Sequence, residues 1–223
     1  NIKMDTSNDI DNSVITNVIS NMHKMVSNRG FDMSNVNRYP AQDHFSKAID
    51  EFKSGRNSLD LYIENTDSSK ENYGKKLYVH LMMNMQNIKK PNEIEKLYNM
   101  IESSHDLNNN DHVVIIIFHD LPESVVNLEM KYPNLTVFSH KKLLFNLIEH
   151  EYVPEHVLLS PSEKVALLSD LMISSYDKLP LISKTDAVCR YYNFRIGDVI
   201  KITRPSLAGK VHVMYRYVQD IIH

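Results

Sequence analysis

The clearest pattern of apolar and polar positions lies near the C-terminal end of the sequence. Val188, Tyr191 and Tyr192 are spaced as on one face of a short helix, which Thr185 or Asp186 can cap. Further on, apolar and polar residues alternate over 198–204, as in a strand with one buried face. The pattern predicts a helix and a strand that have little apolar surface of their own.

Turn-forming residues separate these elements. Asn193 tolerates the left-handed conformation that ends a helix, and Gly197 permits the turn into the strand. Residues 205–210 are expected to form a hairpin loop. A second strand then returns with its apolar side chains on one face: Val211, Val213, Tyr215 and Tyr217.

Upstream, helical and strand spacing alternate. The expected elements are a helix over 9–27 ending at Gly30, a short helix with Phe45, Ile49 and Phe52, strands over 59–64 and 76–83, a helix opened by a capping box of Asn92 and Glu95, a strand over 112–118, a helix over 123–131 and a strand over 135–138. The strand His112–Phe118 is apolar on both faces, which is typical of a central strand covered by two layers. This order predicts a mixed α/β fold with an N-terminal α/β sandwich.

Two stretches lie between these regions. Leu143–Ile148 fits either a helix or a strand by its periodicity. Ser160, Pro161 and Glu163 occupy the cap, first and third positions of a predicted helix, and so form a capping box. That helix is expected to bury four apolar residues: Val165, Leu168, Leu171 and Met172.

The composition is that of a folded, mildly acidic protein. Of the 223 residues 42% are hydrophobic, the net charge is -3, and Cys189 is the single cysteine. One cysteine excludes an internal disulfide and fits a reducing compartment. The first residues are polar with no signal peptide pattern, and the apolar run 113–118 is too short to span a bilayer. We expect a soluble intracellular protein.

Enzyme and metal chemistry find little support in the sequence. His150 and His156 resemble part of a zinc motif, but that motif needs two histidines one helical turn apart, and Pro154 lies between these two. A metal-dependent nuclease would need carboxylates on the strand after Asp60, and the strand 76–81 has none. Phosphate-loop, nucleophile-elbow and dinucleotide motifs are also missing. We expect no catalytic residue, no metal site and no cofactor.

The predicted helix near Cys189 leaves two further questions. Cys189 has only Arg190 as a local cation, so a structural thiol is favoured over a nucleophile. Tyr191 and Tyr192, close to Arg190 and Arg195, fit either a stacking platform for single-stranded nucleic acid or, at helical spacing, a core position.

A set of spaced residues in this region resembles one protein family. In order they are Leu179-Pro180, Asp186, Val188, Arg190-Tyr191-Tyr192, Gly197, Val199, Lys201-Ile202, Arg204-Pro205-Ser206, Gly209 and Tyr215-Arg216. The set resembles the assembly module of a small DNA-directed RNA polymerase subunit that archaea and eukaryotes share, the fifth subunit of the eukaryotic enzymes. The segment His150–His156, with Leu159-Ser160 and Glu163, is similar to a second signature of that family. Ala187, Asn193 and the loop tip depart from the usual family residues.

The resemblance continues more weakly into the N-terminal half. Met25-Val26 with Arg29-Gly30 and Phe31 resembles the first-helix exit of the long, eukaryotic form, and Leu121–Ser124 falls where that form begins a helix. Similarity to the family favours a strand over 143–148. It also implies two domains: an N-terminal jaw over 1–149, which archaeal relatives lack, and a small α+β assembly domain over 150–223.

The resemblance implies a non-catalytic subunit of a multisubunit DNA-directed RNA polymerase. Its partners would be the largest polymerase subunit, neighbouring subunits and, beside the jaw, downstream duplex DNA. Residues expected to face the largest subunit are Tyr152, Val153, Pro154, His156, Leu179, Pro180, Arg190, Tyr191, Lys201, Arg204, Tyr215 and Arg216. Those expected nearest DNA are Leu121, Pro122 and Ser124. Docking is favoured over solvated strand faces because aromatic and Arg side chains are typical interface anchors.

A stand-alone nucleic-acid-binding or modifying protein is the alternative. Residues 150–223 hold nine Lys or Arg and eight Asp or Glu, a net charge of +1, which leaves -4 for residues 1–149. Free-standing nucleic-acid binders are usually basic, so this balance favours the subunit interpretation. The expected location is the nucleus of a cell, or a virion or host cytoplasm if a virus encodes the chain.

Overall fold

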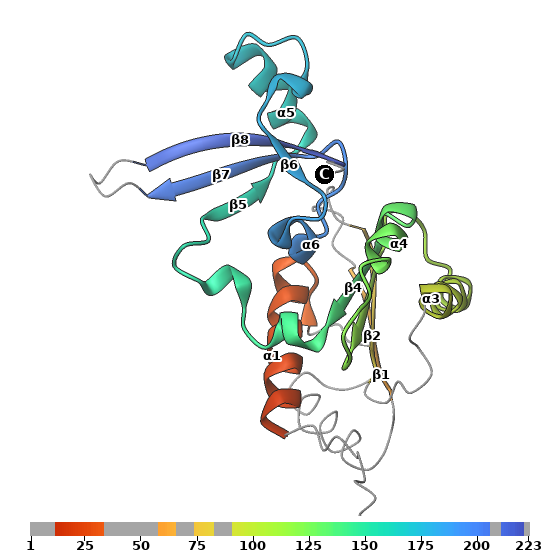
Figure 1. Cartoon of the computed structure of the whole chain (residues 1–223). Coiled ribbons are helices and arrows are strands. Elements are labelled where there is room, and N and C mark those ends of the chain that lie inside the picture. The colour runs from red at the N-terminus through yellow and green to blue at the C-terminus, as the bar shows by residue number, and fades with distance from the viewer. Residues whose placement is uncertain (1–11, 34–57, 66–73, 83–90, 206–210, 221–223) are drawn as a thin grey trace, which may run out of the picture.

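The computed structural model describes residues 12–33, 58–65, 74–82, 91–205 and 211–220 (Figure 1). The helix predicted around Phe45 and the hairpin loop 206–210 lie outside these residues. The described chain forms two four-stranded sheets. The fold is mixed α/β, as predicted.

The first sheet has the order β1-β2-β3-β4. β1 and β2 are antiparallel, and β2, β3 and β4 are parallel. Because parallel neighbours need crossover connections, a helix follows β2 and another follows β3. The elements are α1 (Asn12–Asn28), β1 (Ser58–Glu64), β2 (Lys76–Met82), α3 (Pro91–His105), β3 (His112–Ile117), α4 (Val125–Lys131) and β4 (Leu135–Ser139).

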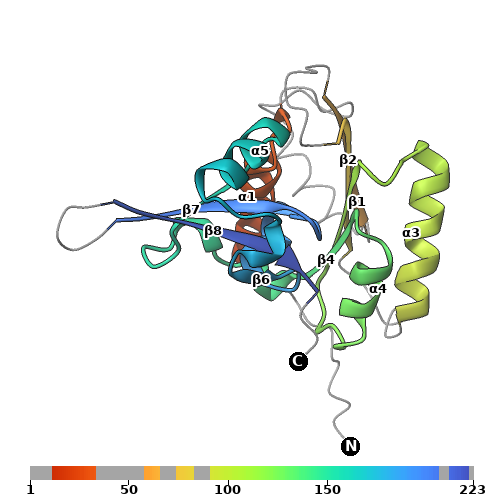
Figure 2. The ribbon, with the colours of Figure 1, turned by 90° about the horizontal axis from the view of Figure 1, so that it is seen from above.

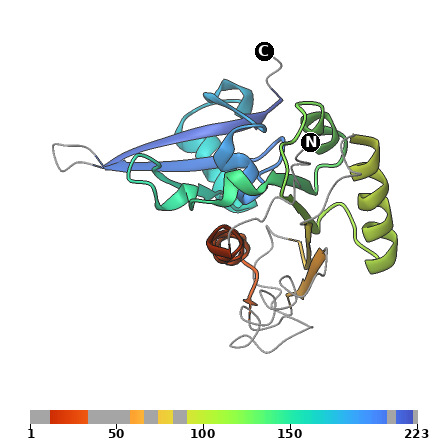
Figure 3. The same cartoon turned by 60° about the horizontal axis from the view of Figure 1, so that its bottom comes forward.

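Helices cover both faces of this sheet. Figures 1 and 3 show α1 on one side and α3 on the other. One core joins α1 to Leu61, Val79 and Ile116, and the other joins α3 and α4 to Val113 and Ile115. All six residues of β3 are buried, so the prediction of a central strand covered on both faces is confirmed.

The second sheet has the order β5-β7-β8-β6, with β6 parallel to β8 and the other pairs antiparallel. α5 packs on one face near Val199, and α6 packs on the other near Ile200. Figure 1 shows β7 and β8 running side by side away from α5 and α6, and Figure 2 shows the same two strands from above. The elements are β5 (Glu155–Leu158), α5 (Pro161–Asp170), β6 (Leu181–Ser183), α6 (Ala187–Tyr192), β7 (Val199–Pro205) and β8 (Val211–Gln219).

The local signals around α5 and α6 are confirmed. Ser160 and Glu163 form both bonds of the capping box. The Asp186 side chain, rather than Thr185, caps α6 by accepting from the Val188 amide. Asn193 has a φ of 57° and Gly197 a φ of 94°, so both adopt the left-handed conformations that the helix end and the turn require.

Three predictions were wrong. Leu143–Ile148 is no strand: the 3-10 turns His140–Leu143 and Leu147–Glu149 occupy this segment, and the Asn146 side chain caps the second turn. α3 begins at Pro91, which suits a first helical position, so Asn92 lies inside the helix and is not its cap.

The third error concerns α5. The helix ends at Asp170 and buries Leu167, whereas Val165, Leu171 and Met172 are 65%, 44% and 94% exposed. α5 contacts the sheet through one narrow stripe, and the predicted apolar face points mainly to solvent.

Gly74 lies where the chain enters β2, pressed against the 108–111 loop. A Cβ at this position would lie 1.9 Å from the Asn110 carbonyl oxygen, whereas Gly197 has open space around it. Gly74→Ala should lower the free energy of unfolding by at least about 2 kcal/mol, because backbone must move. Gly197→Ala should cost about 1 kcal/mol through its left-handed φ alone. Urea unfolding measures both, and an equal or smaller loss for Gly74→Ala would contradict the close approach.

Candidate docking surface and the junction between the sheets

Five of the predicted interface residues fall into two separate places. Lys201, Arg204 and Tyr215 lie on the distal hairpin, the part of β7 and β8 formed by residues 201–205 and 211–215. Arg190 and Tyr191 lie on α6, where the second sheet meets the first. The two places have different chemistry.

One face of the distal hairpin is apolar with a single cation. Lys201 lies opposite Tyr215, and Thr203 lies opposite Val213. Val213 is 46% exposed and Val211 63% exposed. Nearer α5, Tyr215 joins the core of that helix and is half-buried. The side chains of this face are therefore partly buried near α5 and exposed further along the hairpin.

The opposite face mixes apolar and basic groups. Arg204 pairs with His212 across the strands, and both are exposed; Met214 beside them is 39% exposed. Arg216 Nη1 donates to the Leu181 carbonyl at 2.8 Å, which ties β8 to β6. The described residues of β7 and β8 include Lys201, Arg204 and Arg216 and no carboxylate. The hairpin is thus a basic, partly apolar surface.

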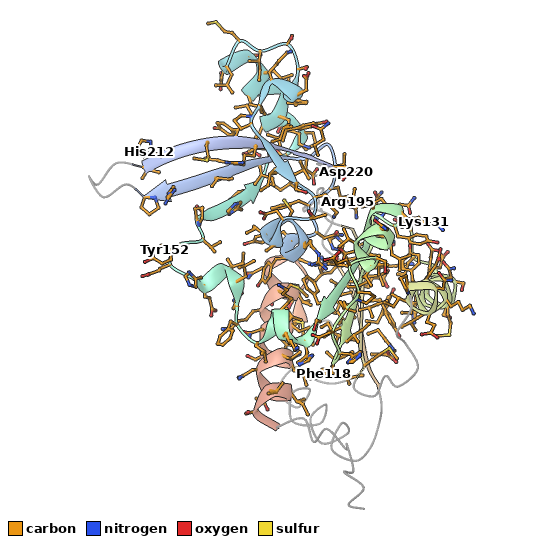
Figure 4. The ribbon with its side chains drawn as sticks, in the orientation of Figure 1. Phe118, Lys131, Tyr152, Arg195, His212 and Asp220 are labelled. Carbon is orange, nitrogen blue, oxygen red and sulfur yellow. The ribbon has the colours of Figure 1, made fainter. Side chains whose placement is uncertain are left out.

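The segment before β5 approaches this surface from the same side. In Figure 4, Tyr152 and His212 lie on the same side of the molecule. Tyr152 is 76% exposed, and its amide donates to His150 Nδ1. Val153 packs into the second sheet's core, and His156 Nδ1 lies 2.7 Å from the Pro154 carbonyl oxygen. Of the four residues of this segment that were predicted to face the largest subunit, Tyr152 is therefore the exposed one.

Two other predicted residues differ in exposure. Leu179 is buried against α5, so its side chain belongs to the core. Pro180 is exposed and its carbonyl accepts from the Tyr217 amide. Leu179 shapes the surface only from beneath.

The junction is built around a buried arginine at the end of α1. Arg29 is fully buried, and its Nε and Nη2 donate to the carbonyl oxygens of Tyr191 and Arg190 at 2.7 and 2.9 Å. These carbonyls belong to the last turn of α6, where a helix lacks internal donors. Arg29 thus satisfies the end of a helix that lies far away along the chain.

A bidentate ion pair lies beside it. Arg190 donates to both carboxylate oxygens of Glu129 on α4, at 2.9 and 2.8 Å, and to the Val137 carbonyl at 2.6 Å. Glu129 is 4% exposed and also accepts from the Val137 amide at 2.7 Å. The ion pair therefore binds both the amide and the carbonyl of Val137 on β4, which lies at an edge of the first sheet.

We no longer assign a docking role to Arg190 and Tyr191, because both side chains are engaged inside the molecule. The Arg190 side chain is committed to Glu129, and Tyr191 is 3% exposed within the core of the first sheet. The Tyr191 hydroxyl also accepts from Asn28 at 2.9 Å. The stacking platform is excluded for Tyr191 by the same burial, and its core alternative is confirmed.

Three further polar groups were missed by sequence reasoning. Lys184 is 5% exposed and donates to Asn193 Oδ1 and the Phe194 carbonyl; burial, followed by the Arg29 charge, lowers its pKa to about 8. Arg195, placed between the sheets in Figure 4, donates to the carbonyls of Asn110 and Asp111. Only Glu129 carried a signal, since it shares the apolar helix face of Val125 and Leu128.

The candidate chemistry of Cys189 and Asp60 has a simple structural account. Cys189 is fully buried, and burial raises the pKa of its thiol to about 12, which fits a structural thiol. Asp60 contacts His80 Nδ1 across β1 and β2. In the part of the chain that the structure describes, no cluster of three or more His, Cys, Asp or Glu is placed to hold a metal ion.

The predicted DNA-proximal residues form an exposed turn before α4. Pro122 and Ser124 are exposed and Leu121 is half-buried. The amides of Val125 and Val126, the first of the helix, donate to the carbonyls of Pro122 and Glu123. These two amides are therefore not available to a phosphate.

Comparison with known proteins matches the second sheet to one family. Residues 145–218 match the family described as RNA polymerase Rpb5, C-terminal domain. The chain is 38% identical over 96 residues to DNA-directed RNA polymerases I, II, and III subunit RPABC1 of Caenorhabditis briggsae, which is 43% of this chain and 44% of that protein. It is 39% identical over 75 residues to DNA-directed RNA polymerase subunit Rpo5 of Methanosphaera stadtmanae, which is 34% of this chain and 96% of that protein.

These matches define a class of protein, the small subunits of multisubunit RNA polymerases. The chain belongs to the Rpb5, RPABC1 and Rpo5 family of DNA-directed RNA polymerase subunits. It is the longer, eukaryote-like form, although the matched segment spans less than half of the C. briggsae protein. Within the described ranges, no helix is long and apolar enough to cross a membrane.

His112 gives the junction a dependence on pH. Burial, and then the charges of Arg29, Arg195 and Lys184, hold its pKa well below the ordinary value. The unfolded chain takes up this proton near about pH 6.5 while the folded chain does not, so acid favours unfolding.

The free energy of unfolding should therefore fall between about pH 7 and about pH 5, and His112→Gln should make that fall smaller. Thermal unfolding across this range measures the difference. The same substitution at the exposed His212 controls for the loss of a histidine. An unchanged pH slope in His112→Gln would contradict a neutral His112.

Proposed function

We propose that the chain is a non-catalytic subunit of a multisubunit DNA-directed RNA polymerase that docks on the largest subunit through its second sheet. The observation that carries this proposal is the match of residues 145–218 to the C-terminal domain of a family whose members are shared, non-catalytic polymerase subunits. The whole of the second sheet except the last residue of β8 lies within that match.

The docking surface in this proposal is the distal hairpin together with Tyr152. Exposed valines beside Tyr215 supply apolar contact, and Lys201 and Arg204 supply charge without a neighbouring acid on the same strands. Interfaces combine such apolar and aromatic anchors with Arg, whereas a strand face used only for solubility would carry few exposed apolar residues. Arg216 has a lesser part, since it is already bound to Leu181.

The proposed division of labour assigns the docking domain to 150–223 and the jaw to 1–149. Each sheet has a core of its own, which supports this division, although Tyr191 of the docking domain packs in the core of the first sheet. Leu147 and Ile148 pack against both cores, so the proposed boundary falls at a shared contact. In the complete enzyme the first sheet would lie beside downstream DNA, with the turn Leu121–Ser124 as the proposed point of approach.

Val213 is the sharpest probe of the docking surface, because its side chain is exposed and belongs to neither core of the second sheet. Val213→Glu should weaken binding to the largest subunit by about 2 kcal/mol, or about 30-fold. Co-expression and pull-down of the two subunits measures it. Val165→Glu, at an exposed valine on α5, is the matched control and should bind normally. An equal loss in the control, or none in Val213→Glu, would place the docking surface elsewhere.

Contact with DNA should depend on assembly. Affinity for duplex DNA comes mainly from cations that release counterions, and residues 1–149 carry a net charge of -4. The isolated chain should show no measurable duplex binding at physiological salt, whereas a photocrosslinker at Leu121 should reach downstream DNA in the complete polymerase. Tight, steeply salt-dependent binding by the isolated chain would instead favour a stand-alone nucleic-acid-binding protein.

A further inference from the structure

We propose that Arg29, Glu129 and Arg190 hold the two sheets in one fixed relative orientation, so that the chain is a single rigid body. They are positioning residues: they act on the placement of the first sheet relative to the distal hairpin. The functional consequence rests on the proposed docking, since a rigid chain that docks through the hairpin also fixes where its first sheet lies.

The Arg29 guanidinium joins elements of both halves of the molecule. Arg29 directly follows α1, binds the carbonyls of Arg190 and Tyr191 in the last turn of α6, and lies 3.5 Å from Thr136 Oγ1 on β4. A guanidinium presents its donors in a fixed plane. A rotation of α6 against β4 would therefore break several of these bonds together.

Glu129 and Arg190 also bind backbone groups at one edge of the first sheet. β4 is the edge strand of the first sheet, and an edge presents unpaired backbone groups. The Val137 amide is taken by Glu129 and the Val137 carbonyl by Arg190, while the two side chains also bind each other. At Val137, the edge strand is thus bound by Arg190, a side chain from the other half of the molecule. The contact at this one residue fixes where α6 lies along β4.

The charged groups of Arg29 and Glu129 are buried. Arg29 is 0% exposed and Glu129 4% exposed, so a different orientation would leave buried charges without their partners. Such an arrangement is strongly disfavoured, and in some proteins buried polar or ionic groups select one geometry among several. By contrast, Lys24 and Glu149 join α1 to the segment that leads into the second sheet at 2.7 Å, but their side chains are 45% and 59% exposed. Water can replace that pair in any orientation.

Arg29, Glu129 and Arg190 do not all belong to the part of the chain that matches the Rpb5 C-terminal domain. Arg190 lies within the matched residues 145–218, whereas Arg29 and Glu129 lie outside them. The Rpo5 protein of M. stadtmanae is matched over 96% of its length by only 34% of this chain. The groups that hold α6 in place are therefore supplied by the part of this chain that lies outside the family domain.

The test is a distance between the two halves of the full-length chain. Met100 on α3 and Val165 on α5 are both more than half exposed, and each can be replaced by Cys for spin labelling. The native Cys189 is fully buried with a thiol pKa of about 12, so it should not compete for the label. Pulsed electron paramagnetic resonance then gives the distribution of label distances in the folded protein.

A single narrow distribution is expected for the otherwise unchanged chain and for the control Lys24→Ala. Arg29→Met and Glu129→Gln should broaden it while the far-ultraviolet circular dichroism stays native. Glu129→Gln is the milder change, because Gln keeps an acceptor for the Val137 amide, and it decides the matter if Arg29→Met does not fold.

Two results would overturn the proposal. One is a broad distribution in the unchanged chain; the other is a narrow distribution in Glu129→Gln despite a lower unfolding temperature, which would make the contacts stabilising only. Pull-down with the largest subunit is measured separately. Its failure in the unchanged chain would remove the proposed function and leave the rigid body standing, whereas retained binding by a variant with a broadened distribution supports both.

Discussion

The structure depends on how a fully buried guanidinium is satisfied. Arg29 cannot reach water, so its donors must find protein acceptors. The carbonyls of Arg190 and Tyr191 in the last turn of α6 are suitable, because a helix terminus offers them few internal donors. This one exchange places α6 against the end of α1 and beside β4. The second sheet packs on the other side of α6, so its position follows from the same contact.

The charge balance of the region follows from this packing. Arg29, Arg190, Lys184 and Arg195 gather near two buried acids, Glu129 and Asp111, and backbone or amide oxygens accept most of their bonds. Dipoles of this kind stabilise cations without adding opposite charges. Burial, and after it the neighbouring cations, lowers the pKa of His112 well below its ordinary value and that of Lys184 to about 8.

What the sequence could predict was decided by the range of each interaction. The Ser160 capping box, the left-handed Asn193 and the buried strand β3 follow from residues within a few positions of each other, and the structure has all three. Arg190 was misread because its partner Glu129 lies 61 residues away and no local pattern connects them. The segment 143–148 was misread because Leu147 and Ile148 serve two cores at once, so they follow neither period. Met172 was assigned to a core that the short α5 does not reach.

The residues that carried the family resemblance divide into two physical roles. Tyr191 and Arg190 face inward and fasten α6 to the first sheet, whereas Lys201 and Arg204 remain available on the distal hairpin. A shared motif identified the family correctly, but it could not separate these roles, because both kinds of residue lie on the same short stretch of chain. Only burial separates them. It follows that substitutions at the two places should have different effects: one on α6 should release one sheet from the other and leave the docking surface in place, whereas one on the hairpin should remove the contact itself.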